Sequence, residues 1–92
     1  MIRDVMDLHT HSLASGHAYS TILEMAQAAR DKGLELLAVT EHGPAMRGSC
    51  QHTYFENIKV IPRERYGVQT LFGVELNILD PEGHVDIEER LL

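Results

Sequence analysis

The strongest constraint on the fold is an amphipathic helix that lies between two segments with the length and composition of strands. The first segment, residues 5–9, is mostly apolar, and the run at residues 36–40 is almost continuously apolar. Such a run is typical of a strand that is covered on both faces, as in a parallel sheet. A strand, a helix and a second strand in this order predict a parallel βαβ unit with a right-handed crossover.

Local signals define both ends of the helix, which we expect over about residues 22–32. Thr21 and Glu24 have the T-x-x-E spacing of a capping box, and Gly33 stands where a left-handed residue ends many helices. An apolar stripe with the spacing i, i+3, i+4 and i+7 consists of Ile22, Met25, Ala26 and Ala29. The helix should therefore bury this stripe against the sheet.

The rest of the chain continues the alternation of helices and strands. The sequence predicts a weaker helix over about residues 53–61, a third strand over residues 69–77, and a turn at residues 80–83 that leads into a hairpin strand at residues 85–87. Three parallel strands cannot close a barrel and leave open edges. We therefore expect an α/β fold whose open sheet is small in itself, pairs with another copy, or is completed by further chain.

The size and charge of the chain exclude several classes of protein. Its 92 residues amount to one domain, residues 1–92, with a thin core, since a chain of this size buries about 60–65% of its unfolded surface. Its 8 basic and 14 acidic residues give a net charge of −6, which disfavours nucleic acid and anionic membranes as partners. A lone cysteine, Cys50, excludes an intrachain disulfide, and residues 1–4 do not resemble a signal peptide, so we expect a cytoplasmic protein.

Histidines cluster near the start of the chain. Three of the 6 histidines, His9, His11 and His17, fall within nine positions. On a strand, His9 and His11 would point to the same side, where they could chelate a metal, and Asp7 has the same parity and could fix a ring tautomer. A lone H-x-H pair is more often a chance pair on a solvated strand end.

The pair is not alone, because each predicted strand delivers a metal-ligating side chain at its carboxyl end. His42 follows the second strand and Glu75 lies near the end of the third. Ligands of parallel α/β sheets gather at that edge, and a metal would offset the cost of burying an acid in an apolar strand. Three coincident strand ends favour a metal site. His17 lies in the loop between the first predicted strand and the helix that follows it. It is either a further ligand near the start of that helix or a residue that caps the helix or fills space.

These segments resemble a known family. Residues 7–12 (DLHTHS), 39–44 (VTEHGP) and 73–77 (GVELN) resemble, in order, the first three motifs of the PHP superfamily, the polymerase and histidinol phosphatase group. Residues 17–21 are similar to the branch of small stand-alone phosphatases with three metal ions. The resemblance covers essentially the whole chain, and it implies the N-terminal part of a distorted (β/α)7 barrel that is not closed in this chain.

The resemblance also implies roles for individual residues. His9 and His11 would bind a first metal ion, Glu75 would bridge the first and second, and His17 and His42 would bind a third. In the family these divalent ions, most often zinc, hold a phosphate and activate a water. Imidazole and carboxylate ligands suit zinc, with manganese or iron as alternatives.

Two features depart from the family pattern. Two further histidine motifs and a late Asp-x-His follow in the family, whereas here only His84 follows Glu75, and we do not assign it as a ligand. Glu41 stands where aspartate is common in the family. Because its side chain is longer, we expect it to support the metal ligands less tightly than an aspartate would.

Three functions follow from these observations. The first is a metal-dependent phosphoesterase that acts on a small phosphorylated substrate, without a nucleic-acid or membrane partner. The second is a non-catalytic or truncated remnant that binds metal or needs a second chain, either a complementing chain or another copy that pairs with an open sheet edge. The third is a nuclease that acts on DNA ends, against which the net charge of −6 counts.

Overall fold

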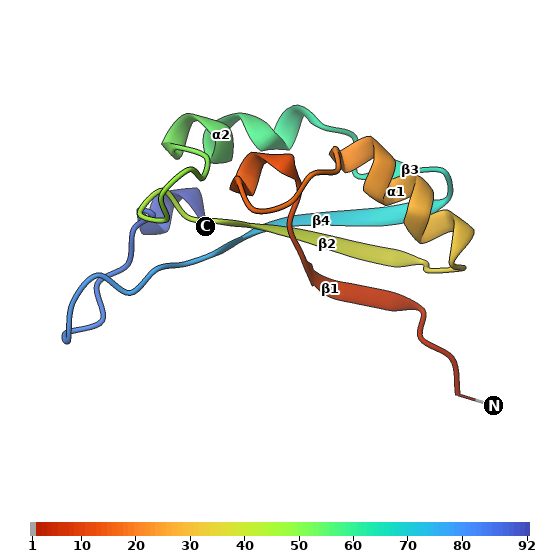
Figure 1. The fold of residues 1–92 in the computed structure, drawn as a ribbon, viewed down its shortest axis with the longest axis horizontal. Helices are drawn as coiled ribbons and strands as arrows, with labels where there is room; N and C mark the ends of the chain where they lie inside the picture. Colours follow the sequence, from red (N-terminus) through yellow and green to blue (C-terminus); the bar gives the residue numbers. More distant parts are fainter. Residues whose placement is uncertain (1) are drawn as a thin grey trace.

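The computed structural model describes residues 2–92 as an open four-stranded sheet with its helices on one face (Figure 1). Three strands are parallel: β1 (Met6–Thr10), β2 (Leu36–His42) and β4 (Val68–Glu75). The short β3 (Glu64–Arg65) runs antiparallel to β4, and the order across the sheet is β1-β2-β4-β3. The structure confirms the predicted α/β class with parallel strands and an unclosed sheet.

The helix α1 (Ile22–Asp31) connects β1 to β2 and begins and ends as its sequence predicts. The hydroxyl of Thr21 accepts the amide of Glu24, whose carboxylate accepts the amide of Thr21 in return. Gly33 follows the helix with a φ of 77°, a conformation that is strained for residues with a Cβ. The capping box and the glycine thus fix the length of the crossover.

The core lies between α1 and the sheet. Its fully buried members come from α1, β2 and β4 and are Ala29, Leu37, Val39 and Val68. The predicted stripe of α1 faces this core: Ala26 and Ala29 are buried, and Ile22 and Met25 are half-buried. Burial of each large aliphatic side chain contributes about 1.5–3 kcal/mol, so this small cluster helps to hold the helix against the sheet.

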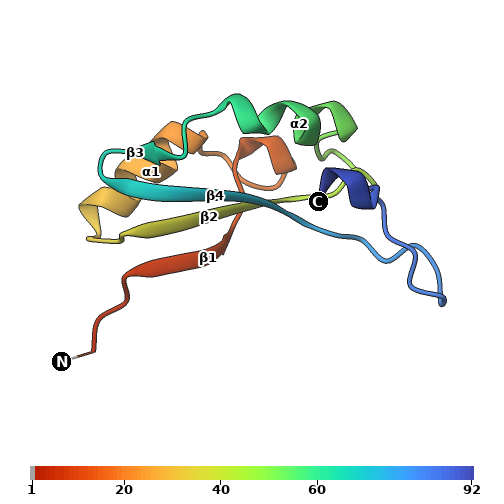
Figure 2. The same ribbon diagram turned by 180° about the vertical axis from the view of Figure 1, so that it is seen from behind.

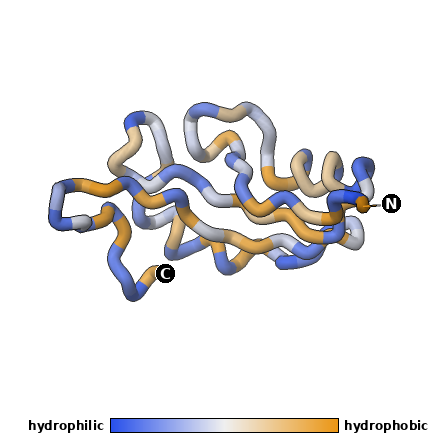
Figure 3. Tube along the Cα trace, turned by 90° about the horizontal axis from the view of Figure 1, so that it is seen from below, coloured by the Kyte–Doolittle hydropathy of each residue, from blue (hydrophilic) through white to orange (hydrophobic). Residues whose placement is uncertain are grey.

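Within residues 2–92, the other face of the sheet carries no helix. Figures 1 and 2 show α1, α2 (His52–Asn57) and the short 3-10 turn η1 (Leu13–Ser15) on the same side of the strands. On the strands, the apolar side chains of Met6, Leu8 and Leu71 are 48%, 53% and 46% exposed. Figure 3 views the molecule from this side, with hydrophobic stretches along the strands. This helix-free face is therefore an uncovered apolar surface.

The segment between β2 and β4 contains the predicted weaker helix and one strand that we did not predict. The helical part consists of α2 and η2 (Ile58–Val60) and ends before Pro62. A two-residue turn then joins β3 to β4, with Tyr66 at a φ of 56° and Gly67 at 77°. Two positive φ values are typical of a tight hairpin turn, for which Asn-Gly is the usual signal and Tyr-Gly is not.

The hairpin strand predicted at residues 85–87 is wrong. The turn at residues 80–83 forms, with the amide of Gly83 donating to the carbonyl of Asp80 at 3.0 Å, but only an isolated bridge joins Ile78 to Val85. The side chain of Asp86 instead accepts the backbone amides of Ala45 and Asn77 near the end of the sheet, and residues 85–87 do not form a strand. The chain closes with η3 (Glu89–Leu91). No helix within residues 2–92 is long and apolar enough to cross a membrane.

Candidate metal centre

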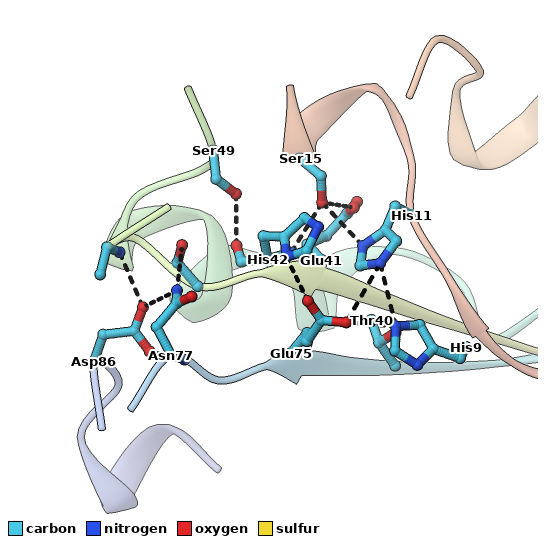
Figure 4. A network of polar contacts seen from close by, with 12 residues as sticks. His9, His11, Ser15, Thr40, Glu41, His42, Ser49, Glu75, Asn77 and Asp86 are labelled. Atoms are coloured by element: carbon cyan, nitrogen blue, oxygen red, sulfur yellow. Dashed lines mark hydrogen bonds and ion pairs between the residues drawn. The ribbon is translucent and has the colours of Figure 1, made fainter. Parts of the chain in front are cut away.

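Four of the predicted ligands meet at the carboxyl ends of the three parallel strands (Figure 4). His9 lies on β1, His11 directly after it, His42 ends β2, and Glu75 ends β4. In the parallel register His42 is the direct partner of Glu75. Strand pairing thus brings together side chains that are far apart in the sequence.

The pairing of β1 with β2 is irregular at this end. The register shifts between Asp7 and Thr10, and two side-chain contacts hold the strands there instead. Thr10 Oγ1 donates to the carbonyl of Ala38 at 2.7 Å, and Thr40 Oγ1 donates to the carbonyl of Thr10 at 3.2 Å. These reciprocal hydrogen bonds position the end of β1 that carries the H-x-H pair.

One oxygen of Glu75 lies among the rings of the H-x-H pair. Glu75 Oε1 is 2.6 Å from His9 Nε2 and 3.7 Å from His11 Nε2, and the two nitrogens are 3.2 Å apart. Each of the three residues offers one ligand atom, and these atoms lie within 4.8 Å of one another. Two imidazoles and a carboxylate in this arrangement fit a single divalent cation of the zinc, manganese or iron type.

The other oxygen of Glu75 faces His42. Glu75 Oε2 lies 2.6 Å from His42 Nδ1, yet this buried nitrogen makes no hydrogen bond of acceptable geometry with any residue that the structure describes. A buried polar atom without a hydrogen bond is costly, and this nitrogen would lose that cost if it served as a ligand to a divalent cation. The carboxylate of Glu75 therefore points one oxygen at the His9–His11 pair and the other at His42. A carboxylate that bridges two ions needs this arrangement.

The rings of the cluster pack against one another. His11 and His42 stack with their centroids 4.2 Å apart and their planes at 7°. Partial burial, and then the neighbouring His42, lower the pKa of His11, against the opposing effect of Glu75. A lowered pKa keeps the imidazole neutral, which is the form that binds metal.

His17 and Asp7 lie differently from these four. The ring of exposed His17 meets that of His42 edge-on, with centroids 5.7 Å apart, so His17 stands at the rim of the cluster. The carboxylate of Asp7 accepts the backbone amide of His9 at 3.3 Å rather than a ring nitrogen. Asp7 also lines a cavity beside Met25 and Lys32. Its role in fixing a tautomer stays a prediction.

Glu41, whose longer arm was expected to hold it loosely, is buried beside the histidines. Glu41 is 1% exposed and accepts the amide of Ser12 at 2.8 Å and the hydroxyls of Ser12, Ser15 and Tyr54. Burial, and then the charge of Glu41, raise the pKa of Tyr54. The longer arm thus reaches four donors instead of being loosely held. The available signal was a lone acid inside the apolar second strand.

Sequence reasoning missed Asp86, which fastens the loops that follow β2 and β4. Its carboxylate accepts the amides of Ala45 and Asn77, each at 2.9 Å, and the side-chain amide of Asn77 at 2.7 Å. These loops directly follow His42 and Glu75, so Asp86 connects the chain segments on which both ligands lie. Figure 4 shows this contact beside the cluster.

The remaining histidines lie outside the cluster. His52 is exposed at the start of α2. His84 Nδ1 lies 2.7 Å from Asp80 Oδ2 within the turn and, with Glu82, forms a second group of ligand-type side chains on the surface. Asp80 also accepts the backbone amides of Glu82 and His84, so its carboxylate stabilises the turn at residues 80–83.

Comparisons with known proteins show the family of the chain. The family model for the PHP domain matches residues 7–92. Probable phosphatases of Caldanaerobacter subterraneus subsp. tengcongensis, Acetivibrio thermocellus and Photobacterium profundum are 54%, 52% and 51% identical to this chain over 99%, 96% and 96% of its length. In each case the match covers 36% of the relative, so the chain spans about a third of the length of the curated relatives it matches.

Proposed function

The chain belongs to the PHP domain family, and from that premise we propose that it acts as a metal-dependent phosphoesterase on a small phosphorylated substrate. The relatives named probable phosphatase support the reaction class. The observation that carries the proposal is the carboxylate of Glu75, which holds one oxygen at 2.6 Å from His9 and the other at 2.6 Å from His42.

Each ligand in this arrangement has a distinct place. His9 and His11 would hold one ion with Oε1 of Glu75, and His42 would hold another with Oε2. Exposed His17 stands beside His42, where it could complete a further ion or meet the phosphate. Divalent ions bound there would polarise the phosphoryl group and activate a water.

The donor set is compatible with zinc as the ion, with manganese and iron as alternatives, and the family resemblance implies up to three ions. Neutral imidazoles are borderline ligands and a carboxylate oxygen is a hard one, and all three metals accept this mixture. Partial burial keeps the pKa of His11 below its ordinary value, so its lone pair stays available near neutral pH.

The charge of the chain supports a small substrate over nucleic acid. A net charge of −6 would repel a polyanion, whereas one phosphate group can be drawn in by the ions themselves. A nuclease acting on DNA ends is therefore the weaker assignment. Strong, salt-sensitive binding to single-stranded DNA would favour it instead.

The proposal is tested by metal analysis together with hydrolysis of p-nitrophenyl phosphate. The full chain should retain a divalent metal after dialysis, lose activity with a chelator and regain it with zinc. His11→Ala should abolish activity, whereas His52→Ala, which alters an exposed histidine outside the cluster, should not. Activity that is unchanged by the chelator and by His11→Ala would refute the proposal.

A second candidate is a chain that binds metal but turns over only with a partner, or not at all. The relatives are longer than this chain, and the helix-free face leaves Met6, Leu8 and Leu71 about half exposed. A complementing chain or another copy could pair with the open edge of β1 and supply further ligands. Three ions per chain would favour the working enzyme, and one or none would favour this alternative. A cytoplasmic location stays a prediction.

A further inference from the structure

The buried carboxylate of Glu41 has a fixed set of hydrogen-bond partners. The amide of Ser12 is 2.8 Å from Oε1, and the hydroxyls of Ser15 and Tyr54 are 2.7 Å and 2.9 Å from Oε1 and Oε2. The hydroxyl of Ser12 donates to Oε2 as well. An ionised carboxylate only accepts and offers about four acceptor positions, so all four donors are satisfied when Glu41 is charged.

The hydroxyl of Ser15 connects this carboxylate to the candidate ligands. Its oxygen lies 2.7 Å from Glu41 Oε1, 3.3 Å from His11 Nδ1 and 2.9 Å from the amide of His42. The amide can only donate to the hydroxyl. The single hydroxyl proton goes to the nearer and charged acceptor, because charge-assisted hydrogen bonds are the stronger ones.

A count of protons then decides the state of the His11 ring. Ser15 Oγ has given its proton to Glu41 and meets His11 Nδ1 with a lone pair, so a hydrogen bond there requires the proton to be on Nδ1. A neutral ring with Nδ1 protonated carries its free lone pair on Nε2. That nitrogen is the one that lies 3.2 Å from His9 Nε2 and 3.7 Å from Glu75 Oε1.

We propose that Glu41 and Ser15 are positioning residues that fix His11 in the Nδ1-protonated tautomer and so aim its Nε2 lone pair at the cluster. That His11 binds a metal ion rests on the proposed function. The tautomer of His11 does not, because it can be observed in the metal-free chain. Groups that orient a metal-binding histidine from behind typically change metal affinity about 10–100-fold when they are removed.

The first test needs no variant. Nitrogen NMR of the metal-free full chain with isotope-labelled histidine, at a pH where His11 is neutral, distinguishes a protonated ring nitrogen from an unprotonated one. The proposal expects a protonated Nδ1 and an unprotonated Nε2 for His11. The opposite tautomer, or an even mixture of the two, would overturn it.

The second test compares two variants that remove a hydroxyl from the same carboxylate. Ser15→Ala should give a mixture of tautomers at His11 and weaken zinc binding about 10–100-fold, measured by competition with a chromophoric chelator. Tyr54→Phe removes a donor to Glu41 but no contact with His11, and should change neither readout. An unchanged tautomer in folded Ser15→Ala would overturn the proposal, and if Ser15→Ala does not fold, the NMR of the unaltered chain decides.

The outcomes separate this inference from the proposed function. A wild-type chain with the expected tautomer but no zinc binding supports the positioning role and contradicts the metal-dependent function. A chain that binds zinc and hydrolyses phosphate esters with the opposite tautomer supports the function and refutes the role of Glu41 and Ser15.

Discussion

Nδ1 of His42 lies 2.6 Å from Oε2 of Glu75, and the two residues are direct partners in the parallel register of β2 and β4. The backbone therefore sets this contact. Among the described residues the histidine nitrogen is buried without a well-formed hydrogen bond, which makes it a candidate ligand in the proposed metal site.

Glu75→Gln tests the two-sided role of this carboxylate. The amide keeps the size of the side chain but loses the charge and turns an N–H toward one of the two histidine groups. We expect the affinity for zinc to fall by more than about 100-fold, beyond the effect typical of residues that stand behind a ligand. Metal content after dialysis measures the change. Glu35→Gln, an exposed acid at the other end of the sheet, should keep the metal.

Asp86→Asn should make stability less dependent on pH. Partial burial pushes the pKa of Asp86 up, but the hydrogen bonds from Asn77 and Ala45 outweigh it and hold the pKa below 3.8. Asp86 thus contributes stability that is present above pH 3.8 and is lost as the pH falls through the lowered pKa. The variant should lose about 1–3 kcal/mol at neutral pH and less in acid, in urea unfolding at several pH values.

The control for this variant is Asp4→Asn, which removes an exposed carboxylate that lies before β1. It should leave both the stability at neutral pH and its acid dependence as they are. Equal acid dependence in Asp86→Asn and in the unaltered chain would contradict the role given to Asp86.

Gly43→Ala tests how closely the loop after β2 approaches Asp86. A Cβ at Gly43 would lie 2.7 Å from Asp86 Oδ1 and closer still to Oδ2, so the hydrogen bonds to Ala45 and Asn77 would have to shift. We expect a loss of about 1–3 kcal/mol in thermal or urea unfolding. Gly73→Ala is the matched control, since its Cβ would lie 3.4 Å from Thr40 Cγ2. Equal stability of the two variants would contradict the close approach.

Thr21→Ala tests the start of α1. The variant removes one half of the capping box and should lower the free energy of unfolding by about 1 kcal/mol. Ser20→Ala changes the exposed neighbour and should have little effect. If both substitutions cost the same, the capping box does not stabilise the helix.

The sequence predicted those parts of the site that follow from local pattern. The H-x-H pair, the histidine after the second strand and the glutamate near the end of the third all lie at strand ends, and parallel pairing brings strand ends together. The limits of α1 could be read from Thr21 and Gly33 for the same reason, because caps are local.

The parts that could not be predicted depend on contacts between distant segments. The four donors to Glu41 come from η1, the residue before it and α2, so the sequence around Glu41 shows only a lone acid. Asp86 looked like a strand residue because nothing near it shows that it binds Ala45 and Asn77. The β3–β4 hairpin was missed because Tyr66 takes a positive φ that its residue type disfavours.

The most direct test of the account is anomalous X-ray diffraction from crystals of the chain grown with zinc. We predict an anomalous peak bounded by His9 Nε2, His11 Nε2 and Glu75 Oε1, the three atoms that already lie close together. A peak only at the surface group of Asp80, Glu82 and His84, or none at all, would contradict the claim that these strand ends form a metal centre.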